Sequence, residues 1–515
     1  MIPFIVALPL LFAFLTALVN AFRVDRRIYR LLFMVGIVSP WPVFLLKIGD
    51  MPVSAIVGGW ERISGIEVVL NEYNYYFVLG ELIVFSLVGL YALHCYTGRD
   101  RSNDTSVRYI LPLMLLLHGG ILGALVSSDL FNFYVYMEIA SLSSIILVSC
   151  SADRGAKRAS YRYLMLYLMS SFFFIFAIGI IYAKTGYLNF VLIRDNLVMS
   201  EEIRAAVAIA LVSLLVKAGI FPLHFWLPEA HAKADAPISA VLSGVVVKVP
   251  MYGAILFLVY VGIDFFADLL VVIAFASMFF GIFMAVLQDN AKKLLAYHTV
   301  SQMGFVLLGI ATLDVDAAIF YVFAHTLFKS GLFLGVGTLA RAHNTTNLDE
   351  LSYRSSKVLM VAIIMLSLAI GGISPFIGAF CKNQLLSNLD GFQVYLFYMA
   401  GIGTLVSFMK LNYKLMQPGT RSMTVSTASY LEKLATISLA LLTLIFGIYW
   451  YPRLKYLDAV LIVIAVAVFF SLQYLGLFRK TMSSVFTVDS LGREINLYTG
   501  TFVFVIVLFL VQLFY

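Results

Sequence analysis

The segment LVKAGIFPLHFWLPEAH at residues 215–231 places a lysine and two prolines inside an otherwise apolar run. A second segment, AIGGISPFIGAFCKN at residues 369–383, combines paired glycines, a proline and Lys382 in the same way. Proline and glycine release backbone groups from helical hydrogen bonds, and at membrane depth protein or water must satisfy those groups. The two segments therefore predict two broken membrane helices at corresponding positions in two halves of the chain, a pattern that points to an ion site.

The composition places the whole chain in a lipid bilayer. Of its 515 residues, 62% are hydrophobic and 12% are charged. Apolar runs of about 20 residues, long enough to cross a bilayer, recur along the chain with short polar connections between them. We therefore predict an all-α polytopic membrane protein with about 14–16 transmembrane helices. The first run, residues 1–22, is interpreted as a retained span rather than a signal peptide.

The broken segments also suggest how the chain is organised. We expect flanking helices at residues 1–108, a first five-helix repeat at 109–259, a second at 260–416 and further flanking helices at 417–515. The paired glycines and β-branched residues between positions 48 and 73 predict a small hairpin on the outer surface, within the first of these regions.

The distribution of charge predicts the orientation. The chain has 35 Lys and Arg residues and a formal net charge of +7. Most of these basic residues lie in the loops that face the cytoplasm if the N-terminus is outside, so we expect a cell-membrane protein with both termini outside. No soluble basic face is available for nucleic acid. The three cysteines and seven histidines show no spacing that suggests zinc, haem or an iron–sulfur cluster in this chain.

Five ionisable residues lie near the middle of apolar runs: Glu138, Lys217, Lys248, Lys329 and Lys382. A charge at bilayer depth costs from about 3 to more than 10 kcal/mol, so such residues persist when they are paired, hydrated or functional. We expect the Glu138 carboxylate to pair with a buried lysine, Lys217 in particular, so that each group alters the proton affinity of the other. A structural acid and a lysine that extends to the membrane surface are the alternatives.

The remaining candidates extend this set into a proton relay. Lys248 is the expected middle member, with Pro250 loosening the helix beside it. His325 and Lys329 lie four residues apart on one helical face, which suits proton transfer between an imidazole and an amine. Lys382 follows the second break and is expected to be the last buried site before the outer face.

Secondary candidates are single polar residues that more often form packing hydrogen bonds: Glu81, His118, His224 and His298. Lys410 lies near the end of its span, and we interpret it as a side chain that extends to the membrane surface.

Several of these segments resemble one family. They are SSDLFNFYVYMEIASLSS (127–144), KAGIFPLHFWLPEAHAKADAPISAVLSGVVVKVPMYGAIL (217–256), DNAKKLLAYHTVSQMGFVLLGI (289–310), AHTLFKSGLF (324–333) and GISPFIGAFCKNQLL (372–386). The chain resembles the antiporter-like subunits of respiratory complex I, Mrp-type Na+/H+ antiporters and membrane-bound hydrogenases. Lys233 and Asp235 depart from the small residues and proline usual at those positions, and this departure is expected to alter the inner entrance of the ion path.

The resemblance implies two inverted five-helix repeats, each with a broken helix. It also implies a proton relay of Glu138, Lys217, Lys248, His325, Lys329 and Lys382. The expected function is proton translocation within a redox-driven complex, such as a membrane-bound hydrogenase, with iron–sulfur and NiFe or similar centres in partner subunits. The alternatives are a component of an Mrp-type Na+/H+ antiporter powered by an ion gradient, and a scaffold or quinone-binding component.

Overall fold

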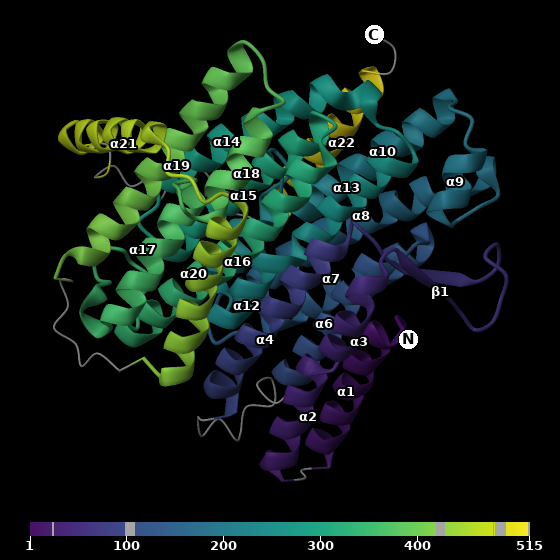
Figure 1. The fold of residues 1–515 in the computed structure, drawn as a ribbon, viewed down its shortest axis with the longest axis horizontal. Helices are drawn as coiled ribbons and strands as arrows, with labels where there is room; N and C mark the ends of the chain where they lie inside the picture. The colour runs from purple at the N-terminus through teal and green to yellow at the C-terminus, as the bar shows by residue number, and fades with distance from the viewer. Residues whose placement is uncertain (23–24, 98–108, 419–427, 477, 479–490, 513–515) are drawn as a thin grey trace. The chain divides into compact units, whose positions relative to one another are not determined.

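The computed structural model describes residues 1–22, 25–97, 109–418, 428–476, 478 and 491–512, and these are mostly helical (Figure 1). Among them, 12 helices are long and apolar enough to cross a membrane. Shorter apolar helices also occur at Ile110–Val126, Lys357–Gly371 and Leu497–Val511. The all-α polytopic fold is therefore confirmed.

Seven of the basic loop residues used to predict orientation lie outside the described residues: Arg23, Arg99, Arg101, Arg108, Arg421, Arg479 and Lys480.

The chain forms two compact units, and the boundaries of the two five-helix repeats stay a prediction. The first unit comprises Met1–Ala218, Val245–Leu269 and Ile495–Tyr515. Its elements are α1 (Phe4–Ala21), α2 (Arg26–Val38), α3 (Pro40–Lys47), β1 (Val53–Val57), β2 (Ile66–Leu70), α4 (Tyr75–Thr97), α6 (Ile110–Val126), α7 (Leu130–Ser149), α8 (Ala156–Thr185), α9 (Phe190–Asn196), α10 (Glu201–Ala218), α13 (Lys248–Tyr260) and most of α22 (Leu491–Val511).

The second unit comprises Gly219–Gly244 and Leu270–Glu494. Its helices are α11 (Trp226–Lys233), α12 (Ala236–Val241), most of α14 (Ala267–Val286), α15 (Ala291–Ala311), α16 (Val315–His343), α17 (Lys357–Gly371), α18 (Ile377–Leu386), α19 (Phe392–Met416), α20 (Tyr430–Trp450) and α21 (Tyr456–Tyr474).

Small residues allow close helix packing in the first unit. Helix α6 packs against both α1 and α7. A Cβ atom at Gly120 would lie 2.9 Å from the backbone nitrogen of Ala140 on α7, and one at Gly123 would lie 2.3 Å from the ring of Tyr136. Helix α8 packs against both α7 and α10. The packing therefore brings α7 and α10, which carry Glu138 and Lys217, toward the shared neighbour α8.

The predicted hairpin is present in the first unit. Strands β1 and β2 pair antiparallel, with Val53 opposite Leu70 and Val57 opposite Ile66. The Glu67 carboxylate accepts hydrogen bonds from Arg62 (2.9 and 2.7 Å) and from Asn189 Nδ2 (2.8 Å). Burial opposes ionisation of Glu67, but these hydrogen bonds and the charge of Arg62 together hold its pKa below the ordinary value.

Both predicted helix breaks are present. Helix α10 ends at Ala218, and α11 begins at Trp226. Helix α17 ends at Gly371, and α18 begins at Ile377. The residue after each first segment is a glycine with positive φ, 70° at Gly219 and 82° at Gly372, a conformation that glycine adopts without strain. Each break also contains a proline, Pro222 or Pro375, which cannot donate a backbone hydrogen bond.

A third irregular segment precedes Lys248, close to the proline that the sequence predicts to loosen this helix. Residues Leu242–Val246 form a π-helical turn, and α13 begins at Lys248. Pro250 is the third residue of α13 and has no backbone N–H, so it cannot donate to the carbonyl of Val246, four residues earlier and the last residue of the π turn. The helix is therefore irregular beside Lys248.

Lys410 does not extend to the membrane surface, so that interpretation was also wrong. The residue is 1% exposed, and its Nζ donates to the carbonyl oxygens of Val286 and Gln288, each at 2.7 Å. These carbonyls lie at and just after the end of α14, where helical acceptors lack partners. Lys410 therefore caps a helix from inside the protein.

Candidate functional site

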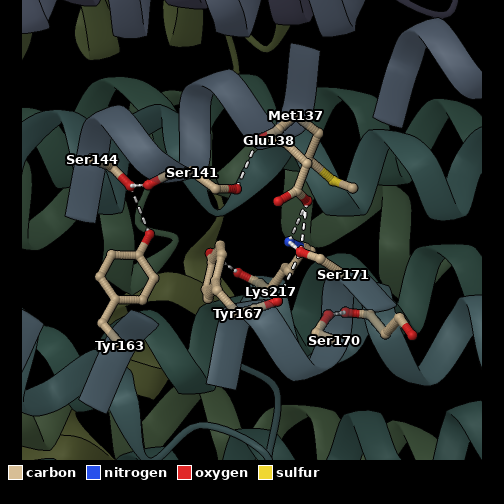
Figure 2. Close-up of polar contacts among 10 residues, drawn as sticks. Met137, Glu138, Ser141, Ser144, Tyr163, Tyr167, Ser170, Ser171 and Lys217 are labelled. Carbon is tan, nitrogen blue, oxygen red and sulfur yellow. Dashed lines mark hydrogen bonds and ion pairs between the residues drawn. The ribbon is translucent and has the colours of Figure 1, made fainter. Parts of the chain in front are cut away.

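Glu138 and Lys217 form an ion pair in the first unit (Figure 2). The Lys217 Nζ donates to Glu138 Oε1 at 2.9 Å and to Ser171 Oγ at 2.8 Å. The Ser171 hydroxyl lies 2.7 Å from Glu138 Oε1 and 2.8 Å from the carbonyl oxygen of Tyr167. Because the hydroxyl has a single proton, it can donate to only one of these two acceptors at a time.

Three helices position this ion pair. Glu138 lies on α7, Ser171 on α8 and Lys217 in the last turn of α10. The Tyr167 hydroxyl donates to the carbonyl oxygen of Lys217 at 2.8 Å, and the Lys217 Nζ lies 4.4 Å from the centre of the Tyr167 ring. The end of α10 leaves the Lys217 carbonyl without a helical donor, so Tyr167 supplies one and fixes the lysine against its own ring.

The two charges are buried to different degrees. The Lys217 side chain is 1% exposed, whereas the Glu138 side chain is 19% exposed. The last turn of a helix favours a positive charge, and a buried ammonium is stabilised by a bonded carboxylate. The ammonium is thus enclosed by protein, while the carboxylate lies nearer the edge of the site.

Lys248 is also buried, at 2% exposed, and is the first residue of α13. The hydrogen bonds that join Glu138, Ser171 and Lys217 do not include it. The structure therefore brings Glu138 and Lys217 into direct contact and places Lys248 on a separate helix of the same unit.

In the second unit, His325 and Lys329 lie on α16 with 0% exposure. The Lys329 Nζ donates to the carbonyl oxygen of Leu295 on α15 at 2.5 Å. The His325 ring packs edge-on against Phe328, with ring centres 5.3 Å apart. Lys329 is thus held by a main-chain carbonyl, and within the described part of the chain no carboxylate is hydrogen-bonded to it.

His298 on α15 lies within the electrostatic range of two lysines of this unit, Lys329 and Lys382. Its ring packs on Phe408 with centres 4.6 Å apart, and neither ring nitrogen has a hydrogen-bond partner among the described residues. This secondary candidate therefore lies in the field of both principal lysines of the second unit.

Lys382 lies on α18, after the second break. Its Nζ donates to the carbonyl oxygen of Gly371 at 2.9 Å and lies 5.2 Å from the centre of the Phe305 ring. Gly371 is the last residue of α17, so the lysine reaches back across the break to a helical carbonyl that lacks a donor.

The other secondary candidates fall into two groups. Glu81 on α4 and His118 on α6 contact each other, with 2.5 Å between Glu81 Oε1 and His118 Nδ1, and both are 0% exposed. His224 lies in the first break among aromatic rings, 4.6 Å from the ring centre of Phe280.

Sequence reasoning missed Ser171 and Tyr167. Serine and tyrosine are frequent in these helices, and nothing in their local sequence distinguishes the two residues that meet Lys217. Only the packing of the helices reveals these two residues as contacts of Lys217. Tyr167 and Ser171 are four residues apart and therefore share the one face of α8 that meets Lys217.

The fold and the site place this chain among polytopic membrane proteins that bury charged side chains between their helices. It has a bundle of apolar helices and a buried ion pair beside a helix break. The chain belongs to the NADH:quinone oxidoreductase/Mrp antiporter transmembrane family, whose model matches residues 127–409. The matched segment contains all six residues of the predicted relay.

Individual relatives come from both branches named in the family description. The chain is 30% identical to a Na(+)/H(+) antiporter subunit of Alkalihalophilus pseudofirmus, over 69% of this chain and 74% of the relative. It is 31% identical to an NADH-quinone oxidoreductase subunit of Desulforudis audaxviator, over 64% and 68%. A chain of the membrane-bound sulfane sulfur reductase, an archaeal respiratory membrane complex, has a similar fold, with a TM-score of 0.78, 21% identity and 93% and 99% coverage. The chain is thus an antiporter-like membrane subunit.

Proposed function

We propose that this chain translocates protons as a membrane subunit of a redox-driven complex, a membrane-bound hydrogenase or a related complex I-like assembly. The proposed relay comprises Glu138, Lys217, Lys248, His325, Lys329 and Lys382, with Glu81, His118, His224 and His298 as secondary members. The observation that carries this proposal is the Glu138–Lys217 ion pair, in which a buried amine contacts both a carboxylate and a hydroxyl.

The contacts of Ser171 suggest how this ion pair opens. When Lys217 is charged, it donates to both Glu138 and Ser171. When Lys217 transfers its proton away, the Ser171 hydroxyl, 2.7 Å from Glu138 Oε1, is placed to donate to that oxygen. The carboxylate therefore keeps one hydrogen-bond donor after the ammonium charge has gone, which lowers the free energy of the open state. Charge at this pair and at the other lysines is coupled by Coulomb interactions that a low-dielectric interior strengthens.

The redox reaction is proposed to occur in partner subunits. The relative that supports this context belongs to an NADH-quinone oxidoreductase. Iron–sulfur and NiFe or similar centres are assigned to those partners, and this chain supplies the proton path. The proposed location is the cell membrane with both termini outside, supported by the concentration of Lys and Arg in alternate loops.

The second candidate function is membership of an Mrp-type Na+/H+ antiporter. It is favoured by the 30% identity to the Alkalihalophilus pseudofirmus antiporter protein. Both candidates use the same buried relay and differ in the source of energy. Purification of the intact assembly followed by identification of its subunits distinguishes them: hydrogenase or reductase subunits support redox drive, and Mrp subunits alone support antiport.

Transport by the assembly in inverted membrane vesicles tests the relay itself. We expect Glu138→Gln and Lys217→Gln to reduce proton translocation at least tenfold while the complex still assembles. Lys184→Gln is the matched control, because Lys184 pairs with Glu202 at the surface, where the two side chains are 47% and 59% exposed. Full transport by both relay variants would overturn the proposal and favour a scaffold or quinone-binding role.

A further inference from the structure

A cavity adjoins Lys382 in the second unit, next to the break between α17 and α18. Its lining includes Gly372, Lys382, Asn383, Tyr398, Lys455 and Asp458. These residues come from the break, α18, α19, the end of the α20–α21 connection and the first turn of α21, so elements distant in the sequence line one space. We call this space the Lys382 cavity.

Asp458 is the acidic group of the Lys382 cavity. It is 9% exposed and lies in the first turn of α21, where the helix dipole favours a negative charge. Its Oδ2 accepts the backbone N–H of Ser374, inside the break, at 2.8 Å. Sequence reasoning did not select Asp458, because it lies near the start of its apolar run, where a carboxylate is unremarkable.

A buried hydroxyl beside Asp458 points to a polar occupant. Ser374 is 7% exposed, and its Oγ has no hydrogen-bond partner among the described residues. A buried hydroxyl without a partner is unfavourable, and a water molecule in a polar environment relieves that cost. Lys382 and Asp458 line the cavity and provide a donor and an acceptor for water within it, and the Ser374 hydroxyl lies next to the backbone N–H that Asp458 accepts.

Lys455 connects the cavity to an exposed segment. Its Nζ donates to Asn383 Oδ1 at 2.6 Å, and Asn383 directly follows Lys382. Lys455 ends the connection between α20 and α21, in which Leu454 is 80% exposed. Burial thus decreases from Lys382 and Asp458, through Lys455, to an exposed stretch of chain.

We propose that Asp458 is the proton acceptor for Lys382, and that the Lys382 cavity is the outlet of the relay. The inference rests on the proposed function and assigns the step that follows Lys382. The Lys382 ammonium transfers a proton through cavity water to the Asp458 carboxylate, leaving a neutral amine and a carboxylic acid. The acid then releases its proton to water near the α20–α21 connection, and the positive charge of Lys455 favours return to the carboxylate.

The charged and titratable groups that line the cavity together with Asp458, among the described residues, are Lys382 on α18, Tyr398 on α19 and Lys455 before α21. The alternative role of Asp458 is purely structural, because its hydrogen bond to Ser374 also fixes the backbone of the break. The substitution Asp458→Asn separates these roles. The amide keeps an oxygen that accepts the Ser374 N–H but cannot take up a proton at neutral pH.

The test measures proton translocation by the assembled complex in inverted vesicles. We expect Asp458→Asn to lower the rate at least tenfold with unchanged assembly and thermal unfolding, and Asp458→Glu to restore much of it. Formate, a small carboxylate that carries protons, should raise the rate of Asp458→Asn severalfold and leave the unsubstituted complex unchanged. Asp390→Asn, at an exposed aspartate of the α18–α19 connection, should transport normally.

Each outcome bears on a distinct claim. Full transport by Asp458→Asn together with loss in Lys382→Gln overturns the outlet role of Asp458 and leaves the proposed function intact. Loss of transport in Asp458→Asn with neither formate nor glutamate rescue overturns it too and assigns Asp458 a structural role. Full transport by Lys382→Gln overturns the relay of the proposed function itself.

Discussion

The two broken helices hold their lysines in different ways. Lys217 lies before its break and bonds to a carboxylate and a hydroxyl from two neighbouring helices. Lys382 lies after its break and bonds to the carbonyl oxygen of Gly371, at the end of the preceding helical segment. The first ammonium has its countercharge in direct contact, whereas the second is hydrogen-bonded to a neutral group. Substitution of the two lysines is therefore expected to affect the protein to different degrees.

The largest expected loss in the free energy of unfolding, relative to the unsubstituted protein, is that of Lys217→Met. Removing one partner of a buried ion pair typically costs about 3–5 kcal/mol, because the other charge stays buried. We expect a loss at the lower end of this range, since Glu138 is 19% exposed. Denaturant unfolding of the purified protein in detergent provides the measurement, with Lys184→Met as the surface control. Adding Glu138→Gln to Lys217→Met should recover part of the loss, and a strictly additive double variant would argue against the ion pair.

A smaller loss of stability is expected for Lys382→Met. The substitution removes one hydrogen bond and leaves the Gly371 carbonyl without a donor, at a cost of about 1–3 kcal/mol. Lys382 has no bonded carboxylate among the described residues, so no directly paired charge is left behind. The same unfolding measurement applies. A loss equal to that of Lys217→Met would remove the distinction between the two sites.

Ser171→Ala tests the hydroxyl that distinguishes the first site. Polar contacts between membrane helices contribute roughly 0.6 kcal/mol on average and up to about 1.7 kcal/mol, and we expect a destabilisation in that range. Proton translocation should fall more than this small loss of stability suggests, because Glu138 loses the hydroxyl that is proposed to donate to it when Lys217 is neutral. Ser170→Ala is the matched control, since Ser170 donates to the Ser213 carbonyl instead. Equal transport by the two variants would exclude a role for Ser171 in opening the pair.

The smallest effect is expected at Glu67, a carboxylate paired outside the membrane-spanning helices. Its pKa is held low in the folded hairpin, because hydrogen bonds from Arg62 and Asn189 and the charge of Arg62 outweigh burial. Its contribution is therefore fully present above the unfolded value of about 4.3 and is lost as the pH falls through the lowered folded value.

Arg62 is 45% exposed, so we expect less than about 1 kcal/mol from the Glu67–Arg62 pair. Thermal unfolding between about pH 6 and pH 3 should show this dependence in the unsubstituted protein and less of it in Glu67→Gln. An unchanged pH dependence in Glu67→Gln would assign the titration to other groups. Comparison of this loss of stability with that of Lys217→Met shows how much more the buried ion pair contributes than the partly exposed one.

The sequence predicted what depends on local composition. Apolar runs predicted the membrane fold, and proline and glycine predicted both breaks, because these residues act on their own backbone. The pairing of Glu138 with Lys217 was also predicted, since an isolated charge at that depth is costly. Ser171 and Asp458 were missed because their significance arises from helix packing. Lys410 was misinterpreted because position along a span does not reveal which helix end lies beside a residue.

The π-helical turn at Leu242–Val246 has a mechanical consequence for Lys248. A π turn contains one residue more than an α turn, so such a bulge can migrate along a helix without breaking it. Displacing the bulge past Lys248 would turn that residue by about 100° and shift it by about 1.5 Å along the axis. The amine would then face a different set of neighbours without any break in the helix.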